Sequence, residues 1–307
     1  MASQDRSSEK VAALLGGSPG PGFDSKPMPL EQEFKAEAKY LHERWAETRK
    51  LDGAVLAPLH RIIADDPEAR AAVIARSKMK RHTPPAPRKR RAPRIGSPIR
   101  SGSILTFRFL PFDAEWSMIS GDDSNLGPGP LDADYGGATV DKSNGTFTVD
   151  NDVHAQAFSA YGASGVGVWF QPVADNTYVR VAPYSQGSCK WDDNSNMWAA
   201  HNNAFIGVLV ESFDLRGQDH YVEVDRRIQL WSDGTGWLEE HGFNNSFEVW
   251  FPADTFFQAN ADRWYRIWSW AKAWCDAEGS SGFLGSGSSA DSSMRFDTLW
   301  FVFEQWT

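Results

Sequence analysis

Large aromatic and basic side chains alternate along the segment RWYRIWSWAKAWCDAEG, residues 263–279. The alternating set is Trp264, Arg266, Trp268, Trp270, Lys272 and Trp274. Indole faces can stack on sugar rings or on bases, and the two cations can supply polar contacts, so we nominate these six as ligand-binding residues. Large aromatic residues are also mostly buried for packing, so a core strand or an intramolecular interface is the alternative.

Two carboxylates lie two residues apart in HYVEVDRR, where Glu223 and Asp225 would share one strand face. Paired carboxylates at such spacing resemble those of retaining glycoside hydrolases built on β-sandwiches, in which a further Glu is expected two residues on. Arg227 occupies that position here, and Glu248 is the remaining candidate for a second carboxylate. A solvent-facing strand with alternating charges is the alternative.

Acidic loops recur in the C-terminal two thirds of the chain. Carboxylate and amide oxygens clustered in turns suit Ca²⁺, which makes Asp122, Asp123, Asp192 and Asp193 candidate calcium ligands. None of these loops has the spacing of a calcium loop that ends in a bidentate Glu, and Asp also favours turns for its own sake. We expect no other cofactor.

Recognised catalytic and nucleotide-binding patterns are missing from the sequence. It has no HExxH, GxSxG, phosphate loop, CxxC or dinucleotide fingerprint, and its histidines show no metal-ligand spacing. GASGVG at 162–167 opens no helix and is interpreted as a turn. Cys189 and Cys275 have no evident basic neighbour to activate a thiolate, and the sequence leaves their pairing open. We therefore favour a non-enzymatic role.

A cationic stretch precedes the acidic part of the chain. Residues 76–100 contain ten Lys/Arg, five Pro and no acid. The set Arg88, Lys89, Arg90, Arg91 and Arg94 could bind nucleic acid or another anionic surface electrostatically. A solvated spacer that leans on the acidic domain is the alternative: residues 1–104 carry 20 basic and 12 acidic side chains, and residues 105–307 carry 11 and 28.

Four regions follow from composition and periodicity. Residues 1–29 are rich in Ser, Gly and Pro and are expected to be a disordered lead-in. Residues 30–80 form a helical segment, because Leu30 and Phe34 begin a run at helical spacing and Asp66 precedes Pro67 as an N-cap. Residues 81–102 form a basic Pro-rich linker, and 103–307 a Trp-rich acidic β domain.

The β domain is expected to be mainly β, an antiparallel sandwich or jelly roll of about ten to twelve strands. Short alternating segments such as ILTFRFLPF and TYVRVAPY are separated by turn clusters such as DKSNG, YGASG, WDDNSN and SDGTG. The aromatic density of 263–275 favours a strand over a helix, and the tail MRFDTLWFVFEQW would form a terminal strand pair with it. The Trp face would then be an outer surface, a groove or the contact site for the helical segment.

Three functions stay open at this stage. The sandwich could bind a carbohydrate-like or other small ligand, it could be a self-assembling structural subunit, or it could be a glycan hydrolase. A basic arm before a jelly roll resembles, in outline, the layout of some viral coat proteins, although the acidic sandwich and the preceding helices depart from it. The start of the chain shows no signal peptide and no apolar run reaches membrane-spanning length, so we expect a cytoplasmic protein.

Overall fold

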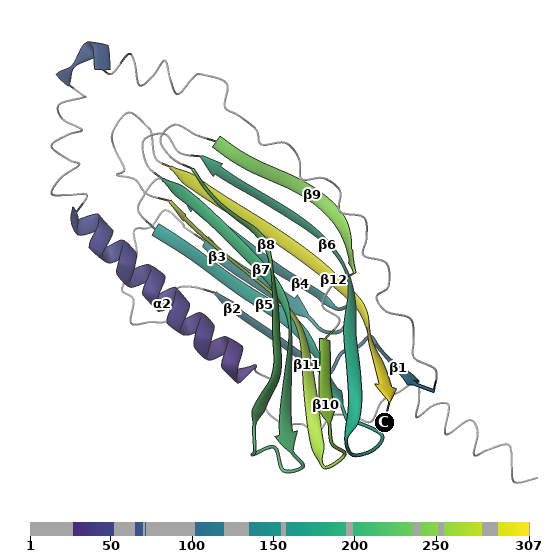
Figure 1. Cartoon of the computed structure of the whole chain (residues 1–307). Coiled ribbons are helices and arrows are strands. Elements are labelled where there is room, and N and C mark those ends of the chain that lie inside the picture. Colours follow the sequence, from purple (N-terminus) through teal and green to yellow (C-terminus); the bar gives the residue numbers. More distant parts are fainter. Residues whose placement is uncertain are drawn as a thin grey trace, which may run out of the picture.

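Two antiparallel sheets face each other in the computed structural model, which describes residues 27–51, 65–69, 71, 102–119, 135–154, 158–194, 199–235, 240–250, 255–277 and 288–306 (Figure 1). Sheet A contains β1 (Ile104–Phe109), β3 (Tyr135–Asp141), β4 (Thr146–His154), β6 (Thr177–Asn194), β9 (Glu240–Trp250), β10 (Thr255–Ala259) and β12 (Ser289–Trp306). Sheet B contains β2 (Ala114–Ile119), β5 (Phe158–Phe170), β7 (Ala200–Asp214), β8 (Tyr221–Thr235) and β11 (Arg263–Ala277). The predicted mainly β, antiparallel sandwich is confirmed.

Each sheet is organised around one long strand. In sheet A, β12 pairs with β6 along its length, with β4 over its first half and with β1 over its last part. In sheet B the order is β2-β5-β11-β7-β8, so β11 is central and pairs with β5 and β7. The strand predicted for 263–275 is therefore confirmed, but its pairing with the tail is wrong, because β11 and β12 belong to opposite sheets.

The inner faces of the sheets form the core. Small and medium side chains of β11, including Ile267, Ala271 and Ala273, pack against the inner side of sheet A, where Phe296, Phe301 and other residues are fully buried. The small inner face of β11 lets the sheets approach closely, as its composition predicts.

Several predicted turns are strands instead. The glycines of YGASG and GASGVG lie inside β5, and WDDN and SDGT lie inside β6 and β8, whereas DKSNG is a turn as predicted. A Cβ at Gly165 would come within 2.6 Å of the Ser269 carbonyl oxygen, and one at Gly167 within 2.8 Å of the Trp268 ring. These glycines therefore serve close side-chain approach within a sheet, which the sequence pattern does not distinguish from a turn.

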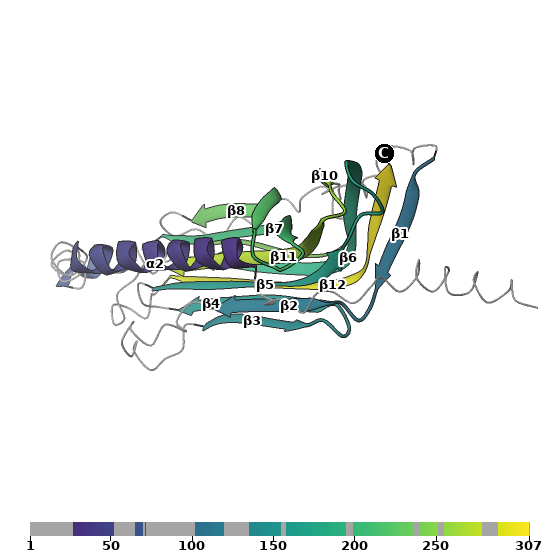
Figure 2. The ribbon, with the colours of Figure 1, turned by 90° about the horizontal axis from the view of Figure 1, so that it is seen from below.

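One long helix, α2 (Met28–Leu51), runs beside β2 and β5 (Figures 1 and 2). It lies within the predicted helical segment, apart from its first two residues. Leu41 and Trp45 continue the helical spacing that Leu30 and Phe34 begin, but their side chains lie outside the described residues. Asp66 accepts hydrogen bonds from the main-chain N–H groups of Glu68 and Ala69 at 2.9 and 3.1 Å, which confirms it as an N-cap.

Candidate binding face

The six nominated residues of β11 share the outer face of sheet B, as the alternation predicts, but that face is covered. Trp268 and Trp270 are fully buried, Arg266 is 1% exposed and Lys272 is 3% exposed, while Trp264 and Trp274 are partly exposed. Leu30 and Phe34 of α2 belong to the same apolar cluster as Trp268 and Trp270. The sequence allowed three roles for this face: an outer surface, a groove or the contact site for the helical segment. In the structure it is the contact site for the helical segment. We refer to the outer face around β11 as the β11 face.

Glycines on the neighbouring strands make room for the buried indoles. Trp270 is the register partner of Gly165 on β5 and of Gly207 on β7. A Cβ at Gly207 would lie 2.3 Å from the Trp270 ring, so no other residue fits without displacing the indole. The ring can therefore lie low on the sheet, which leaves a shallow surface on which a helix can rest.

Helix α2 contacts the β11 face through an apolar stripe at i, i+4 spacing. Leu30 and Phe34 are buried, and Ala38 packs against the same cluster one turn further on. The Phe34 ring lies 5.4 Å from Trp116, 5.9 Å from Tyr161 and 5.7 Å from Trp270, measured between ring centroids. One phenyl ring thus touches aromatic side chains from three strands of sheet B.

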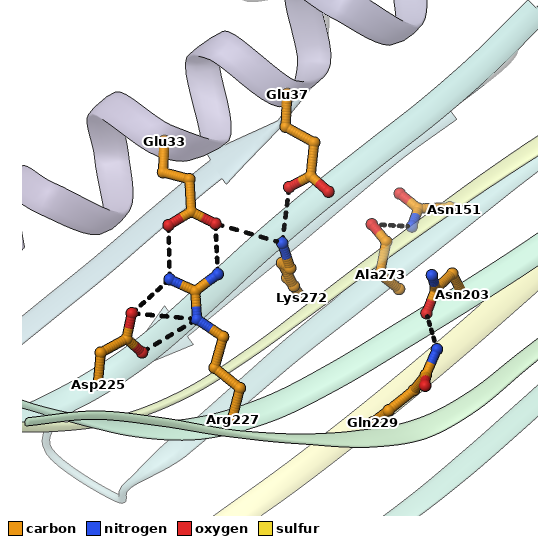
Figure 3. Close-up of polar contacts among 9 residues, drawn as sticks. All are labelled: Glu33, Glu37, Asn151, Asn203, Asp225, Arg227, Gln229, Lys272 and Ala273. Carbon is orange, nitrogen blue, oxygen red and sulfur yellow. Dashed lines mark hydrogen bonds and ion pairs between the residues drawn. The ribbon is translucent and has the colours of Figure 1, made fainter.

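Two glutamates of α2 bind the two cations beside this aromatic cluster (Figure 3). Both carboxylate oxygens of Glu33 accept hydrogen bonds from Arg227, with Nη2 at 2.5 Å from Oε2, and Asp225 binds the same guanidinium. Glu37 accepts a hydrogen bond from Lys272 Nζ at 2.6 Å, and Glu33 lies 3.8 Å from that nitrogen. The hydrogen bond from Arg227 lowers the pKa of Glu33, and hydrogen bonds to Glu33 and then Asp225 raise the pKa of Arg227.

Arg266, in contrast, receives its countercharge from the sandwich itself. Glu211, which is fully buried, accepts hydrogen bonds from Arg266 Nε at 2.9 Å and from Trp268 Nε1 at 2.8 Å, and lies 3.0 Å from His220 Nε2. The guanidinium also lies over Trp169, 5.2 Å from the ring centroid. On the β11 face, the charge of Arg266 is therefore balanced by a residue of sheet B, whereas the charges of Arg227 and Lys272 are balanced partly or wholly by residues of α2.

Lys272 shows this dependence most clearly. Its ammonium lies between the rings of Phe34 at 4.9 Å and Phe205 at 5.2 Å, and its ion-pair partners among the described residues are both on α2. An ammonium taken out of water is costly unless it is paired. The buried state of Lys272 is thus explained by the presence of the helix.

The nominated carboxylates have other partners. Asp225 binds Arg227, and Glu223 accepts a hydrogen bond from the Ser212 hydroxyl at 2.5 Å. The β7–β8 register shifts between Val210 and Glu211, next to this position. The side chain of Glu248 lies outside the described residues, and the hydrolase hypothesis stays a prediction.

Of the four nominated calcium ligands, the structure describes only two, and these point away from each other. Asp192 and Asp193 are consecutive on β6 and so point to opposite faces of sheet A, and Asp122 and Asp123 lie outside the described residues. Within the described ranges no group of three or more His, Cys, Asp or Glu side chains is placed to hold a metal ion. Asp193 is fully buried, and burial, followed by the nearby Asp233 charge, raises its pKa to about 8.

Other sequence predictions concern residues that the structure places elsewhere or not at all. Arg88, Lys89, Arg90, Arg91 and Arg94 lie outside the described residues. Cys189 and Cys275 are buried thiols that are not joined by a disulfide. In the part of the chain that is described, no helix is both long and apolar enough to cross a membrane.

A second aromatic surface lies on the outer side of sheet A, and sequence reasoning missed it. Tyr178 and Phe256 are about half exposed, and both lie near Trp306, with ring centroids 6.1 and 6.3 Å from its ring. Further along β12, Trp300 stacks on Tyr184 at 4.3 Å. The available signal was the alternation within TYVRVAPY, which places Tyr178 and Tyr184 on one face of their strand, and within TLWFVFEQW, which does the same for Trp300 and Trp306.

The sequence also left Glu33, Glu37 and Arg227 outside the nominated binding residues. Their signal is local: two acids four residues apart flank the apolar stripe of α2, and Arg227 and Lys272 each lie within a predicted strand. Nothing in the chain alone indicates which strand meets which helix face, since the two segments are 194 and 235 residues apart in the two pairs.

Comparisons with known proteins do not assign this chain to a family. No family model and no curated protein matches the chain. Among solved structures, TmCBM61 in complex with beta-1,4-galactotriose is 14% identical, with 65% of this chain and 88% of that chain covered and a TM-score of 0.18. The N-terminal cellulose-binding domain of Cellulomonas fimi beta-1,4-glucanase C is 12% identical (52% and 80% covered, TM-score 0.15). The structure of infectious bursal disease virus Gx strain is 8% identical (67% and 40% covered, TM-score 0.13). Scores this low carry no inference about what this chain binds.

Proposed function

We propose that this chain is a non-enzymatic binding and assembly protein, and that the β11 face is its binding face. The ligand type that fits this face is an amphipathic helix with an acidic pair beside a Leu/Phe stripe. Laying an apolar helix face into an aromatic groove is a general mode of protein recognition. In this protein α2 is such a helix.

One observation carries the proposal: the shape and the charge of the β11 face both match α2. Phe34 is buried among Trp116, Tyr161 and Trp270, and Glu33 and Glu37 meet Arg227 and Lys272. Lys272 is buried and its ion-pair partners among the described residues are both on α2, whereas Arg227 is part-exposed and also binds Asp225. Complementary charges across a contact support specific recognition.

The test compares two substitutions on opposite sides of α2. Phe34→Asp puts a charge into the aromatic cluster, whereas Tyr40→Asp changes a side chain that is 63% exposed. In the full-length protein, hydrogen exchange of α2 amides should rise at least tenfold in Phe34→Asp and stay unchanged in Tyr40→Asp. A labelled peptide of residues 28–51 should then bind the Phe34→Asp protein and not the wild type, whose β11 face is occupied.

Two results would sink this proposal. The α2 amides could exchange equally fast in both variants and in the wild type, which would mean that the helix is not held. Alternatively, Phe34→Asp could release the helix while the labelled peptide still fails to bind, even at about 100 times the lowest peptide concentration that the assay detects.

Binding of a carbohydrate-like ligand is the second candidate function. The half-exposed rings of Tyr178 and Phe256 beside Trp306 favour it, because exposed aromatic rings can pack on the apolar faces of sugars. A glycan array should give signals that disappear in Tyr178→Ala/Phe256→Ala and survive in Phe34→Asp. Signals that appear only in Phe34→Asp would instead assign glycan binding to the β11 face, and no signal in any of these proteins would exclude this candidate.

A further inference from the structure

We propose that α2 is an exchangeable arm: the β11 face of one copy accepts α2 of a second copy in place of its own. The inference rests on the proposed recognition of the helix by this face and names the partner as another molecule of this chain. Exchange of an identical element between protomers creates an interface without any new contact, because each helix meets the same residues as before.

The contacts of α2 are of a kind that can be exchanged. They join side chains of one helix face to side chains of sheet B, and none of the main-chain hydrogen bonds found among the described residues links α2 to the sandwich. The ladders of β2, β5, β11, β7 and β8 are complete without it. Removal of the helix therefore leaves both sheets paired as they are.

The chain segment that connects α2 to the sandwich is long enough to allow the helix of another copy to compete for the β11 face. Leu51 ends α2 and Ile104 begins β1, so residues 52–103, 52 in number, connect them. The C-terminal end of α2 and β1 lie at opposite ends of the molecule in both views (Figures 1 and 2). The residue contacts agree with this arrangement. Glu33 meets Arg227, which is level with Trp270, and Glu37 meets Lys272, so α2 runs toward the C-terminal end of β11. Strand β1 pairs with the C-terminal part of β12.

The separation can be compared with the reach of the connecting chain. Fifteen strand residues such as those of β11 span about 50 Å. A fully flexible chain of 52 residues would have a mean end-to-end distance of about 40 Å and would supply its own helix at an effective concentration on the order of a millimolar. The helical residues around Asp66 lie within this connection. A second copy would compete when the local protein concentration approaches that value.

The charges allow exchange to be detected at much lower concentration. One full-length variant carries the reversed helix, Glu33→Arg/Glu37→Arg, on an unchanged sandwich. The other carries the reversed face, Arg227→Glu/Lys272→Glu, with an unchanged helix. Each chain is mismatched with itself, but the helix of each matches the face of the other.

Mass in solution is the readout, measured by light scattering at about 20 μM. Each variant alone should remain near 34.2 kDa, and an equimolar mixture should double its mass, with α2 amides protected from hydrogen exchange only in the mixture. The variant with all four substitutions should be a monomer with protected α2, because its own charges match again.

The outcomes separate exchange from recognition. If the four-substitution variant protects α2 but the mixture stays monomeric, exchange is wrong and helix recognition stands. If the four-substitution variant leaves α2 unprotected while circular dichroism shows an intact sandwich, recognition by charge and the proposed function both fail. If Lys272→Glu prevents folding, the single pair Glu33→Arg with Arg227→Glu, whose side chains are both part-exposed, gives the same test, and no rise in mass on mixing would then overturn the proposal.

Discussion

Asp193 has a carboxyl group whose buried surroundings do not suit its charged form. It points from β6 into the sandwich and is fully buried, and the Asn202 side chain offsets only part of the effect of burial on its pKa. Burial raises its pKa to about 8, and the charge of Asp233 adds to the effect. The side chain is therefore largely neutral at pH 7, and its ionisation opposes folding.

The Asp193→Asn variant should be less sensitive to alkaline pH than the wild type. In the wild type the carboxyl ionises near pH 4 when unfolded and near pH 8 when folded, so its contribution to stability falls as the pH rises between these values. Each unit of pKa difference costs about 1.4 kcal/mol, so removing the charge should raise stability by a few kcal/mol at pH 9 relative to pH 5. Thermal unfolding across this range checks it, with the exposed Asp262→Asn as control. Parallel pH curves for Asp193→Asn and wild type would refute the buried ionisation.

Helix α2 is held by apolar contacts, and its ion pairs mainly set its register. Burying Leu30 and Phe34 contributes about 1.5–3 kcal/mol each, whereas a part-exposed pair such as Glu33 with Arg227 contributes about 0.2–1 kcal/mol. The pair of Glu37 with Lys272 is less exposed on the lysine side, so salt screens it weakly.

High salt should therefore leave α2 in place. We expect the hydrogen exchange of α2 amides to change by less than threefold between 0.05 and 1 M NaCl, where the screening length falls to about 3 Å. Phe34→Ala should release the helix at both salt concentrations, since deleting a buried Phe costs about 3–5 kcal/mol. Release of wild-type α2 at 1 M NaCl would mean that charge, not burial, dominates docking.

Among helices and strands, the sequence predicts the individual elements better than it predicts which elements pack against each other. The alternation in 263–275 predicts β11 and its two faces, and Leu30 with Phe34 predicts the buried stripe of α2. The glycines mislead because Gly167 and Gly207 lie against the rings of Trp268 and Trp270 on a neighbouring strand. No local pattern shows which strand is the neighbour. For this reason the sequence predicts only part of the candidate site. It nominates the residues of β11, but it does not nominate Glu33, Glu37 or Arg227, which complete the site.

At the scale of the whole molecule, the packing of the two sheets against each other determines the fold. Composition and periodicity predict a sandwich, but the assignment of β11 and β12 to opposite sheets depends on long-range packing. Cys189 on sheet A and Cys275 on sheet B both face the interior between them. Burial raises the pKa of Cys189 to about 12 and that of Cys275 well above its usual value, so native thiolate is scarce at both.

The two thiols therefore report whether the sheets separate as one unit. Under native conditions at pH 8, both should react with an alkylating reagent at the same rate, because each becomes accessible only when the sandwich opens. Phe34→Asp should accelerate neither thiol, since α2 covers the outer face of sheet B and both thiols are on the inner side. Peptide mapping of the labelled protein gives the two rates separately. Faster labelling of Cys275 alone would show that sheet B opens without sheet A, and acceleration of Cys275 by Phe34→Asp would show that the helix helps to hold the sheets together.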